Sequence, residues 1–251
     1  MEKIFHLGLD IGSTTAKVVV LDQEENIIYH MYQRHFSDIK NTVTKILKSV
    51  NSKFLIEDAT VMVTGSGGLA VSEWLDIPFI QEVIASTKAI KKFSKKTDVA
   101  IELGGEDAKI TFFRDGIDQR MNGTCAGGTG AFIDQMASLL ETDAMGLNEL
   151  AKKHKIIYPI AARCGVFAKT DVQPLLNQGA AKEDIAASIF QAVVNQTISG
   201  LACGKIIRGN VAFLGGPLHF LSELKNRFIS TLNLKDDEVI SPENSELFVA
   251  L

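Results

Sequence analysis

The same order of strands and helices is predicted twice along this chain, and this duplication constrains the fold more than any other feature. In the first half, apolar and β-branched segments predict three strands, a helix, a short strand and a helix at 4–10, 16–22, 26–32, 37–50, 60–63 and 81–93. In the second half, three strands, four helices, a buried strand and a further helix follow at 99–103, 108–113, 116–121, 127–140, 146–152, 165–177, 182–207, 210–214 and 217–228. We therefore predict two α/β halves, 1–95 and 96–251, each of the order β-β-β-α-β-α, with a ligand cleft between them.

The composition and charge of the chain argue against several classes of function. The 251 residues are 46% hydrophobic and 22% charged, as in an ordinary soluble globular protein. The net charge is −4, and the single basic run, Lys88 to Lys96, is interpreted as a solvated helix face, so nucleic acid is not an expected partner. No run approaches the roughly 20 apolar residues of a membrane span, and no signal peptide precedes the first strand. Three cysteines form no disulfide framework, which favours the cytoplasm.

A first candidate phosphate-binding segment follows the first predicted strand. Asp10 ends that strand and is followed by a glycine, three hydroxyl side chains and a lysine: Gly12, Ser13, Thr14, Thr15 and Lys17. A tight hairpin here would direct backbone N–H groups and hydroxyls at phosphate oxygens, while Asp10 would hold a hydrated Mg²⁺. The alternative is an ordinary hairpin with a polar turn.

Two further glycine turns lie in the second half. Gly104 and Gly105 allow phosphate to approach the backbone, beside three carboxylates that suit Mg²⁺-bound or attacking water: Glu102, Glu106 and Asp107. Gly215, Gly216 and Pro217 follow a buried strand and suit close contact with a nucleoside. A lone glycine pair is weak evidence, whereas the three segments in this order and at these spacings predict a nucleotide site.

Two cysteines lie where helices are predicted to begin. Cys125 precedes Gly127, Gly128 and Thr129, and Cys164 precedes the helix from Gly165. A helix N-terminus favours thiolate over thiol, and two thiolates are half of a four-ligand metal set, so a second copy of the chain could supply the rest. Zinc shared across a dimer, or two buried apolar cysteines, are the alternatives. Cys203 is interpreted as a buried apolar residue.

Together these segments resemble the acetate kinase, sugar kinase, Hsp70 and actin superfamily of ATPases. Within it, the cysteine motifs resemble the activator, component A, of 2-hydroxyacyl-CoA dehydratases and the related benzoyl-CoA reductase ATPase subunits. The most specific pieces are 10–14, 104–105, 121–130 and 164–168. The resemblance implies a duplicated ribonuclease H-like (actin-like) fold. It also implies a cytoplasmic homodimer that binds ATP or ADP with Mg²⁺ and holds one [4Fe–4S] cluster through Cys125 and Cys164 of each copy.

The same resemblance implies a function. The protein would hydrolyse ATP while passing one electron from a ferredoxin or flavodoxin to an iron–sulfur dehydratase or reductase. Gly127, Gly128 and Thr129 would contact the nucleotide, with the two glycines touching phosphate. Nucleotide exchange would then rotate the helices after Cys125 and Cys164 and expose the cluster. Pro242 and Glu243 would close the nucleoside pocket. A small-molecule kinase and a non-hydrolysing regulatory domain remain the alternative functions.

Three features depart from the short activators. Glu102 replaces the usual aspartate, Glu106 replaces a glutamine, and residues 216–220 differ from the usual continuation after the glycine pair. The last residues predict a helix after Pro242 that stops without a C-cap. These features resemble activator-like domains within longer polypeptides.

Overall fold

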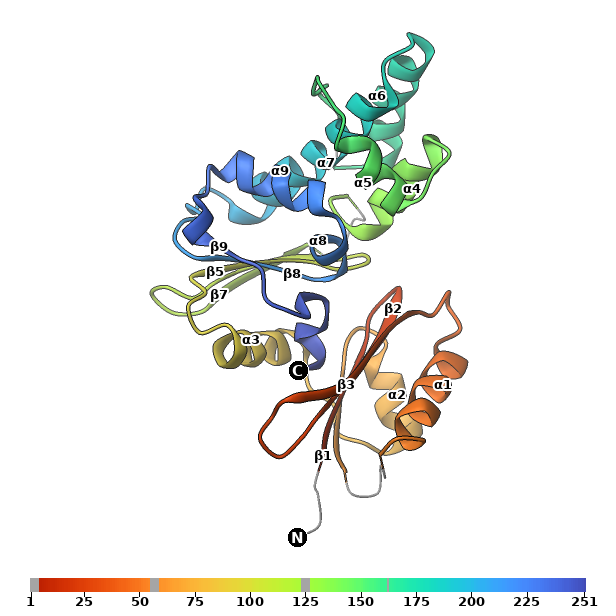
Figure 1. The fold of residues 1–251 in the computed structure, drawn as a ribbon, viewed down its shortest axis with the longest axis vertical. Coiled ribbons are helices and arrows are strands. Elements are labelled where there is room, and N and C mark those ends of the chain that lie inside the picture. Colours follow the sequence, from red (N-terminus) through yellow and green to blue (C-terminus); the bar gives the residue numbers. More distant parts are fainter. Residues whose placement is uncertain (1–4, 55–58, 123–126, 162) are drawn as a thin grey trace. The chain divides into compact units, whose positions relative to one another are not determined.

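The computed structural model describes residues 5–54, 59–122, 127–161 and 163–251. The chain forms two compact units, Met1–Lys95 with Leu247–Leu251, and Lys96–Glu246. Each unit has its own sheet and helices, which confirms the predicted α/β class (Figure 1).

The first unit is built on a four-stranded sheet of order β3-β2-β1-β4. Its described elements are β1 (Phe5–Ile11), β2 (Thr15–Leu21), β3 (Ile27–Arg34), α1 (Ile39–Asn51), β4 (Ala59–Thr64), α2 (Gly68–Leu75) and α3 (Glu82–Phe93). Strand β1 pairs antiparallel with β2 and parallel with β4. Alternate apolar residues of β1 and β2 pack against Val43, Ile46 and Val50 of α1, which forms the core.

The second unit is built on a five-stranded sheet of order β7-β6-β5-β8-β9, with its described α-helices on one side (Figure 1). Its strands are β5 (Val99–Leu103), β6 (Ala108–Phe112), β7 (Asp118–Asn122), β8 (Val211–Leu214) and β9 (Val239–Ile240). Its α-helices are α4 (Gly130–Leu139), α5 (Ala144–Ala151), α6 (Gly165–Asn177), α7 (Lys182–Thr197), α8 (Gly216–Phe220) and α9 (Ser222–Leu232).

The duplication extends to the register of the strands. Asp10 pairs with Lys17 across the β1–β2 hairpin, and Glu102 pairs with Lys109 across the β5–β6 hairpin. In each unit the first strand also has a parallel neighbour on its other side, β4 or β8. The two hairpins therefore place an acid and a lysine at equivalent positions.

Helix α7 is the central helix of the second unit. Most of its residues are buried, and it continues as a π-helix, η2 (Ile198–Ala202), where a helix to residue 207 was predicted. The left-handed backbone of Cys203 and Gly204 ends it early. Lys182–Ala202 is also the one described helix that is long and apolar enough to cross a membrane, but 67% of its apolar window is buried inside the protein.

The C-terminal residues correct the predicted boundary of the second half. A short helix follows Pro242, as predicted, but it is a 3₁₀-helix, η4 (Ser245–Ala250), and Leu247–Leu251 belong to the first unit rather than to the second half. Leu247 and Ala250 pack against Val19 and Leu21 of β2. A side chain on Gly8 would lie only 1.9 Å from the carbonyl oxygen of Ala250, so glycine permits this docking.

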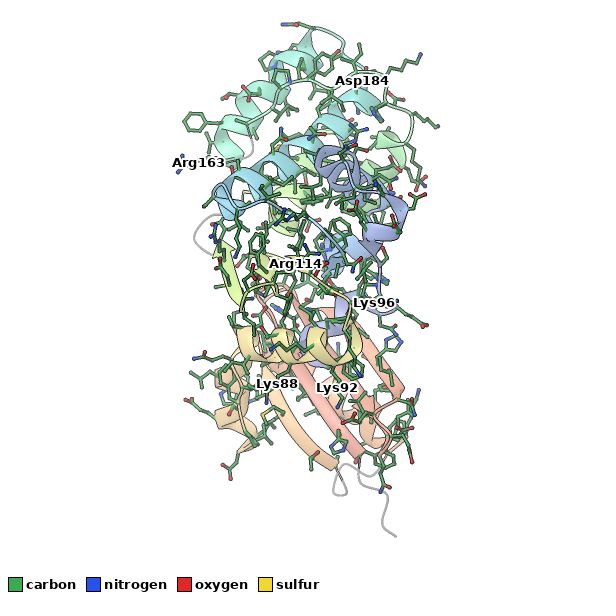
Figure 2. All side chains as sticks on the ribbon, turned by 90° about the vertical axis from the view of Figure 1, so that its left-hand side faces the viewer. Lys88, Lys92, Lys96, Arg114, Arg163 and Asp184 are labelled. Atoms are coloured by element: carbon green, nitrogen blue, oxygen red, sulfur yellow. The ribbon has the colours of Figure 1, made fainter. Side chains whose placement is uncertain are left out.

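Other differences follow from local signals. Helix α2 was not predicted, because it begins within 65–68, where three glycines in four residues indicate a turn. The predicted helix 217–228 is divided into α8 and α9 at Leu221. Lys88 and Lys92 are exposed on α3, as expected for a solvated helix face, and Lys92 pairs with Glu25 (Figure 2).

Candidate functional site

The first hairpin turn is closed by backbone bonds and held by a histidine. The N–H of Gly12 donates to the carbonyl of Thr15 at 2.9 Å. His35 is buried, and its Nε2 donates to the carbonyl of Gly12 at 3.0 Å while its Nδ1 accepts from the N–H of Ser37. The backbone N–H of His35 donates to Thr14 as well. His35, which the sequence motif did not reveal, therefore fixes the turn that carries Ser13 and Thr14.

Asp10 lies at the end of β1 with only 2% of its surface exposed. Lys17 Nζ lies 2.6 Å from Oδ2 of Asp10, whereas Oδ1 has no hydrogen-bond partner among the described residues. An ionised carboxylate can accept about four hydrogen bonds or metal contacts, so one oxygen remains available for a ligand. A buried oxygen left this way fits a hydrated Mg²⁺, which prefers carboxylates and retains water.

The second hairpin contains a buried ion cluster. Lys109 is 1% exposed, and its Nζ lies 2.9 Å from Oε1 of Glu102 and 2.9 Å from Oδ2 of Asp107. Two of the carboxylates predicted to act on water are thus bound to a lysine that the prediction did not include. Glu106, the third, is exposed. The signal for Lys109 was present in the sequence, because the seven-residue spacing from acid to lysine occurs in both hairpins.

The second turn is joined directly to helix α4. The carbonyls of Gly104 and Gly105 accept hydrogen bonds from the N–H groups of Gly130 and Ala131, at 3.0 and 2.7 Å. The first amides of a helix have no partner within it, so the turn caps α4. A side chain on Gly104 would meet the carboxylate of Asp107. The turn and the start of α4 are consequently one bonded structure.

The third glycine turn lies close to the same helix start. Gly215 has a positive φ of 87°, and a side chain there would lie 2.1 Å from the carbonyl of Leu103. Pro217 is near Gly130, so three segments predicted to contact nucleotide meet within the second unit. Gly216 begins α8 and is buried. Pro242 is half-buried and Glu243 is exposed, and no described contact joins either residue to the glycine turns.

One histidine, His219, holds this third turn through contacts with a glutamate and a serine. His219 Nδ1 lies 2.8 Å from Oε2 of Glu246 and 2.9 Å from Oγ of Ser245. The N–H of Gly215 also donates to the carbonyl of Ser245. His219 belongs to the segment that departs from the short activators, and its partners lie in η4. In this chain, His219 therefore links η4 to the third glycine turn.

Cys164 is the N-cap residue of α6, as predicted, and its side chain is partly exposed. It lines a cavity of about 760 Å³ together with Gly127, Gln196 and Gly200. A helix N-terminus stabilises a thiolate, so Cys164 suits a metal ligand. Cys125 lies outside the described residues. Within the described ranges, no group of three or more His, Cys, Asp or Glu side chains is placed to hold a metal ion.

Glycines bring α4, α6 and α7 together near this cavity. Gly128 has a φ of 80°, and its Cα faces the side chain of Gln196 on α7. Gly165, directly after Cys164, lies against the side-chain amide of Gln135 on α4. Thr129, also predicted to contact nucleotide, is fully buried as the N-cap residue of α4. Gly127, which was predicted to touch phosphate, and Cys164, which was predicted to bind metal, therefore line one cavity.

The segment leading to Cys164 is fastened to α7. The carboxylate of Asp184 accepts the N–H groups of Lys155 and Ile156, at 2.6 and 3.0 Å, and these bonds hold the pKa of Asp184 below its usual value. Ser188 accepts the N–H of Tyr158 at 2.8 Å. Asp184 and Arg163, which precedes Cys164, are labelled in Figure 2.

Cys203 differs from the prediction. It is exposed rather than buried, has a positive φ of 46°, and directs its Sγ to the carbonyl of Gly200 at 3.2 Å. The apolar neighbours that suggested burial belong to η2, and Cys203 lies just beyond the end of that helix.

Comparison with known proteins decides the family. The sequence model of the BadF/BadG/BcrA/BcrD ATPase family matches residues 7–243. The chain belongs to this family. A relative of 30% identity is the (R)-2-hydroxyglutaryl-CoA dehydratase activating ATPase of Acidaminococcus fermentans, with 85% of this chain and 83% of that protein aligned. The predicted resemblance is thereby confirmed.

Two solved structures of the family share the fold. Component A of the (R)-2-hydroxyglutaryl-CoA dehydratase of Acidaminococcus fermentans has a TM-score of 0.88 and 26% identity, with 98% of this chain and 95% of that chain covered. The activator of the 2-hydroxyisocaproyl-CoA dehydratase from Clostridium difficile, solved with bound ADPNP, has a TM-score of 0.86 and 28% identity, covering 98% and 91%. The actin-like fold is confirmed, and membership of an activator ATPase family supports ATP binding and hydrolysis.

Proposed function

We propose that this protein is an ATP-driven activator that delivers single electrons to an iron–sulfur partner, either a 2-hydroxyacyl-CoA dehydratase or a related reductase. Its membership of the ATPase family and the activator role of its named relatives support this proposal. The observation that carries it is the pair of hydrogen bonds from Gly130 and Ala131 to the carbonyls of Gly104 and Gly105. They connect the turn that is predicted to bind phosphate with α4, the helix that follows Cys125 in the sequence.

Mg-ATP is the proposed ligand of the glycine turns. Asp10 would organise the metal through its unpaired Oδ1, while Lys17 fixes the other carboxylate oxygen. Phosphate contacts are assigned to Gly12, Ser13, Thr14, Thr15, Gly104, Gly105, Gly127, Gly128 and Thr129. Glu102, Glu106 and Asp107 would orient water, and the nucleoside would lie against Gly215, Gly216 and Pro217, with Pro242 and Glu243 closing that pocket.

Cys164 is the described candidate ligand of a [4Fe–4S] cluster. Its partly exposed thiol, its N-cap position and the adjoining cavity fit a thiolate ligand. Cys125 and Cys164 from each of two copies would complete the four ligands, which makes the active form a homodimer. When bound, the cluster supplies one-electron chemistry, with a ferredoxin or flavodoxin as the proposed donor.

The helix contacts provide the coupling between nucleotide and cysteines. A change in the turn at Gly104 and Gly105 moves the first amides of α4, and α4 packs against α6 through Gln135 and Gly165. Nucleotide can drive this only if ATP and ADP favour different states. The coupling free energy between two sites is typically about 1–3 kcal/mol. We expect a difference of this size in cluster accessibility between the ATP and ADP forms.

Anaerobic iron and sulfide analysis tests this function. The wild-type dimer should contain one [4Fe–4S] cluster per two chains and release phosphate from ATP. Cys164→Ser should lose the iron and much of the dimer, whereas the matched variant Cys203→Ser should retain both, because Cys203 lies beyond η2 and outside the cavity. A Cys164→Ser protein with a full iron content as a stable dimer would contradict the cluster assignment. A wild type that binds no ATP would contradict the nucleotide assignment.

A further inference from the structure

Two buried oxygen atoms at the end of the first sheet have no hydrogen-bond partner among the described residues. They are Oδ1 of Asp10 and Oγ1 of Thr64. The side chains are 2% and 3% exposed, so bulk water does not compensate them. Buried polar atoms in folded proteins are nearly always paired, and an unpaired one calls for an explanation such as a contact with an ion or a water.

The two atoms belong to adjacent strands at the same level. Strands β1 and β4 are parallel, and Asp10 is the register partner of Thr64. Partner residues of paired strands project on the same face of a sheet, so the carboxylate and the hydroxyl are neighbours. Lys17 donates a hydrogen bond to Oδ2 of Asp10, so Oδ1 is the carboxylate oxygen that can bind a ligand beside Thr64.

The next residue keeps the space beside Asp10 open. Gly65 has a φ of 93°, and a side chain there would lie 2.6 Å from Oδ1 of Asp10 and 2.4 Å from the carbonyl of Ile11. Only glycine can stand at this position without filling the space next to the carboxylate. Two unpaired oxygens and a missing side chain thus converge at the ends of β1 and β4.

We infer that Thr64 is a positioning residue for the metal, and that its hydroxyl accepts a hydrogen bond from a water in the shell of the Mg²⁺ that Asp10 holds. Mg²⁺ usually retains several waters, whose hydrogens need acceptors in the protein. The inference deepens the proposed function and rests on it. In the second unit, Leu214 takes the place of Thr64 as the parallel partner of Glu102, so the hydroxyl is specific to the first hairpin.

An isosteric substitution separates this role from a structural one. Thr64→Val removes the hydroxyl but retains the branched shape that packs in a strand. If the hydroxyl serves only the metal, removing a buried unpaired group should leave the protein without Mg²⁺ as stable as before, or more stable. Thr64→Ser should preserve the function because it retains the oxygen.

The experiment measures Mg²⁺ affinity in the full chain at saturating ADP, by calorimetry and by the Mg²⁺-dependent rise of the melting temperature. Thr64→Val should need about tenfold more Mg²⁺, the loss expected for one hydrogen bond, with unchanged ADP affinity in the absence of metal. The control is Thr60→Val on the same strand, because the Thr60 hydroxyl bonds to His6 instead. It should behave like the wild type.

The outcomes distinguish this inference from the function it rests on. Thr64→Val with the Mg²⁺ affinity of the wild type overturns the inference and leaves the nucleotide assignment intact. Thr64→Val that melts lower without Mg²⁺ shows a structural hydroxyl and also overturns it. A wild type that binds no ADP at all overturns the proposed function itself.

Discussion

Replacing Lys109 by methionine should destabilise the second unit strongly. The lysine is 1% exposed and binds Glu102 and Asp107 at 2.9 Å each. Methionine fills a similar volume without charge, so both carboxylates lose their cation while the packing is largely retained. The side chain of Glu102 is only 8% exposed, which leaves its charge poorly hydrated.

The magnitude follows from the burial of this cluster. Removing one partner of a buried ion pair costs about 3–5 kcal/mol, most of it from the charge left behind. In a unit of this size, 1 kcal/mol changes the melting temperature by about 2–4 °C, so Lys109→Met should melt about 10 °C lower. Calorimetry on the full chain would measure this as a change in the transition of the second unit.

Two further variants make the reasoning testable. Arg114→Met also removes a cation from an aspartate of the same unit, but the Arg114 side chain is 50% exposed, so its loss should cost less than about 1 kcal/mol. Combining Lys109→Met with Glu102→Gln and Asp107→Asn removes the two charges that Lys109 neutralised and should restore much of the stability. A Lys109→Met protein as stable as Arg114→Met would refute the argument.

The remaining predictions concern the pH response, the C-terminus and the metal. Hydrogen bonds from backbone N–H groups lower the pKa of Asp184 below its usual 3.8, so its contribution to folding is complete above that value and is lost as the pH falls through the lower folded pKa. Hydrogen exchange should show protection of residues 155–156 declining only in that acidic range for the wild type, and already reduced at neutral pH for Asp184→Asn. Gly8→Ala should lower the free energy of unfolding by about 1–3 kcal/mol, because the new methyl group displaces the C-terminal residues. Carboxypeptidase should then digest Leu247–Leu251 faster than in the wild type. An unchanged digestion rate would count against their docking. Asp10→Asn should lower ATP hydrolysis at least tenfold while leaving about the same dimer content by sedimentation, since it removes charge from the metal position but no core contact.

The two hairpins were predictable because their signals are local. Apolar strands, a terminal acid and a glycine turn lie within about ten residues of each other, and the structure has β1–β2 and β5–β6 at these positions. The family could be recognised for the same reason, since its motifs are short and contiguous. The start of α6 at Cys164 also agreed with the local pattern.

Features that depend on distant residues were not predictable. His35 reaches the carbonyl of Gly12 from 23 positions away, and Thr64 meets Asp10 only because β4 pairs with β1. The docking of Leu247–Leu251 on the first unit depends on the absence of a side chain at Gly8. The end of α7 was misplaced because apolar periodicity continues through η2, while the backbone turns at Cys203.

The shared register of the two hairpins has an evolutionary consequence. If both descend from one ancestral module, the pairs of Asp10 with Lys17 and of Glu102 with Lys109 are its retained signature. The residues beside these pairs have since diverged to Thr64 in one copy and Leu214 in the other. On that descent, the first copy has a buried hydroxyl beside its acid, whereas the second has an apolar neighbour there and a lysine that binds two carboxylates.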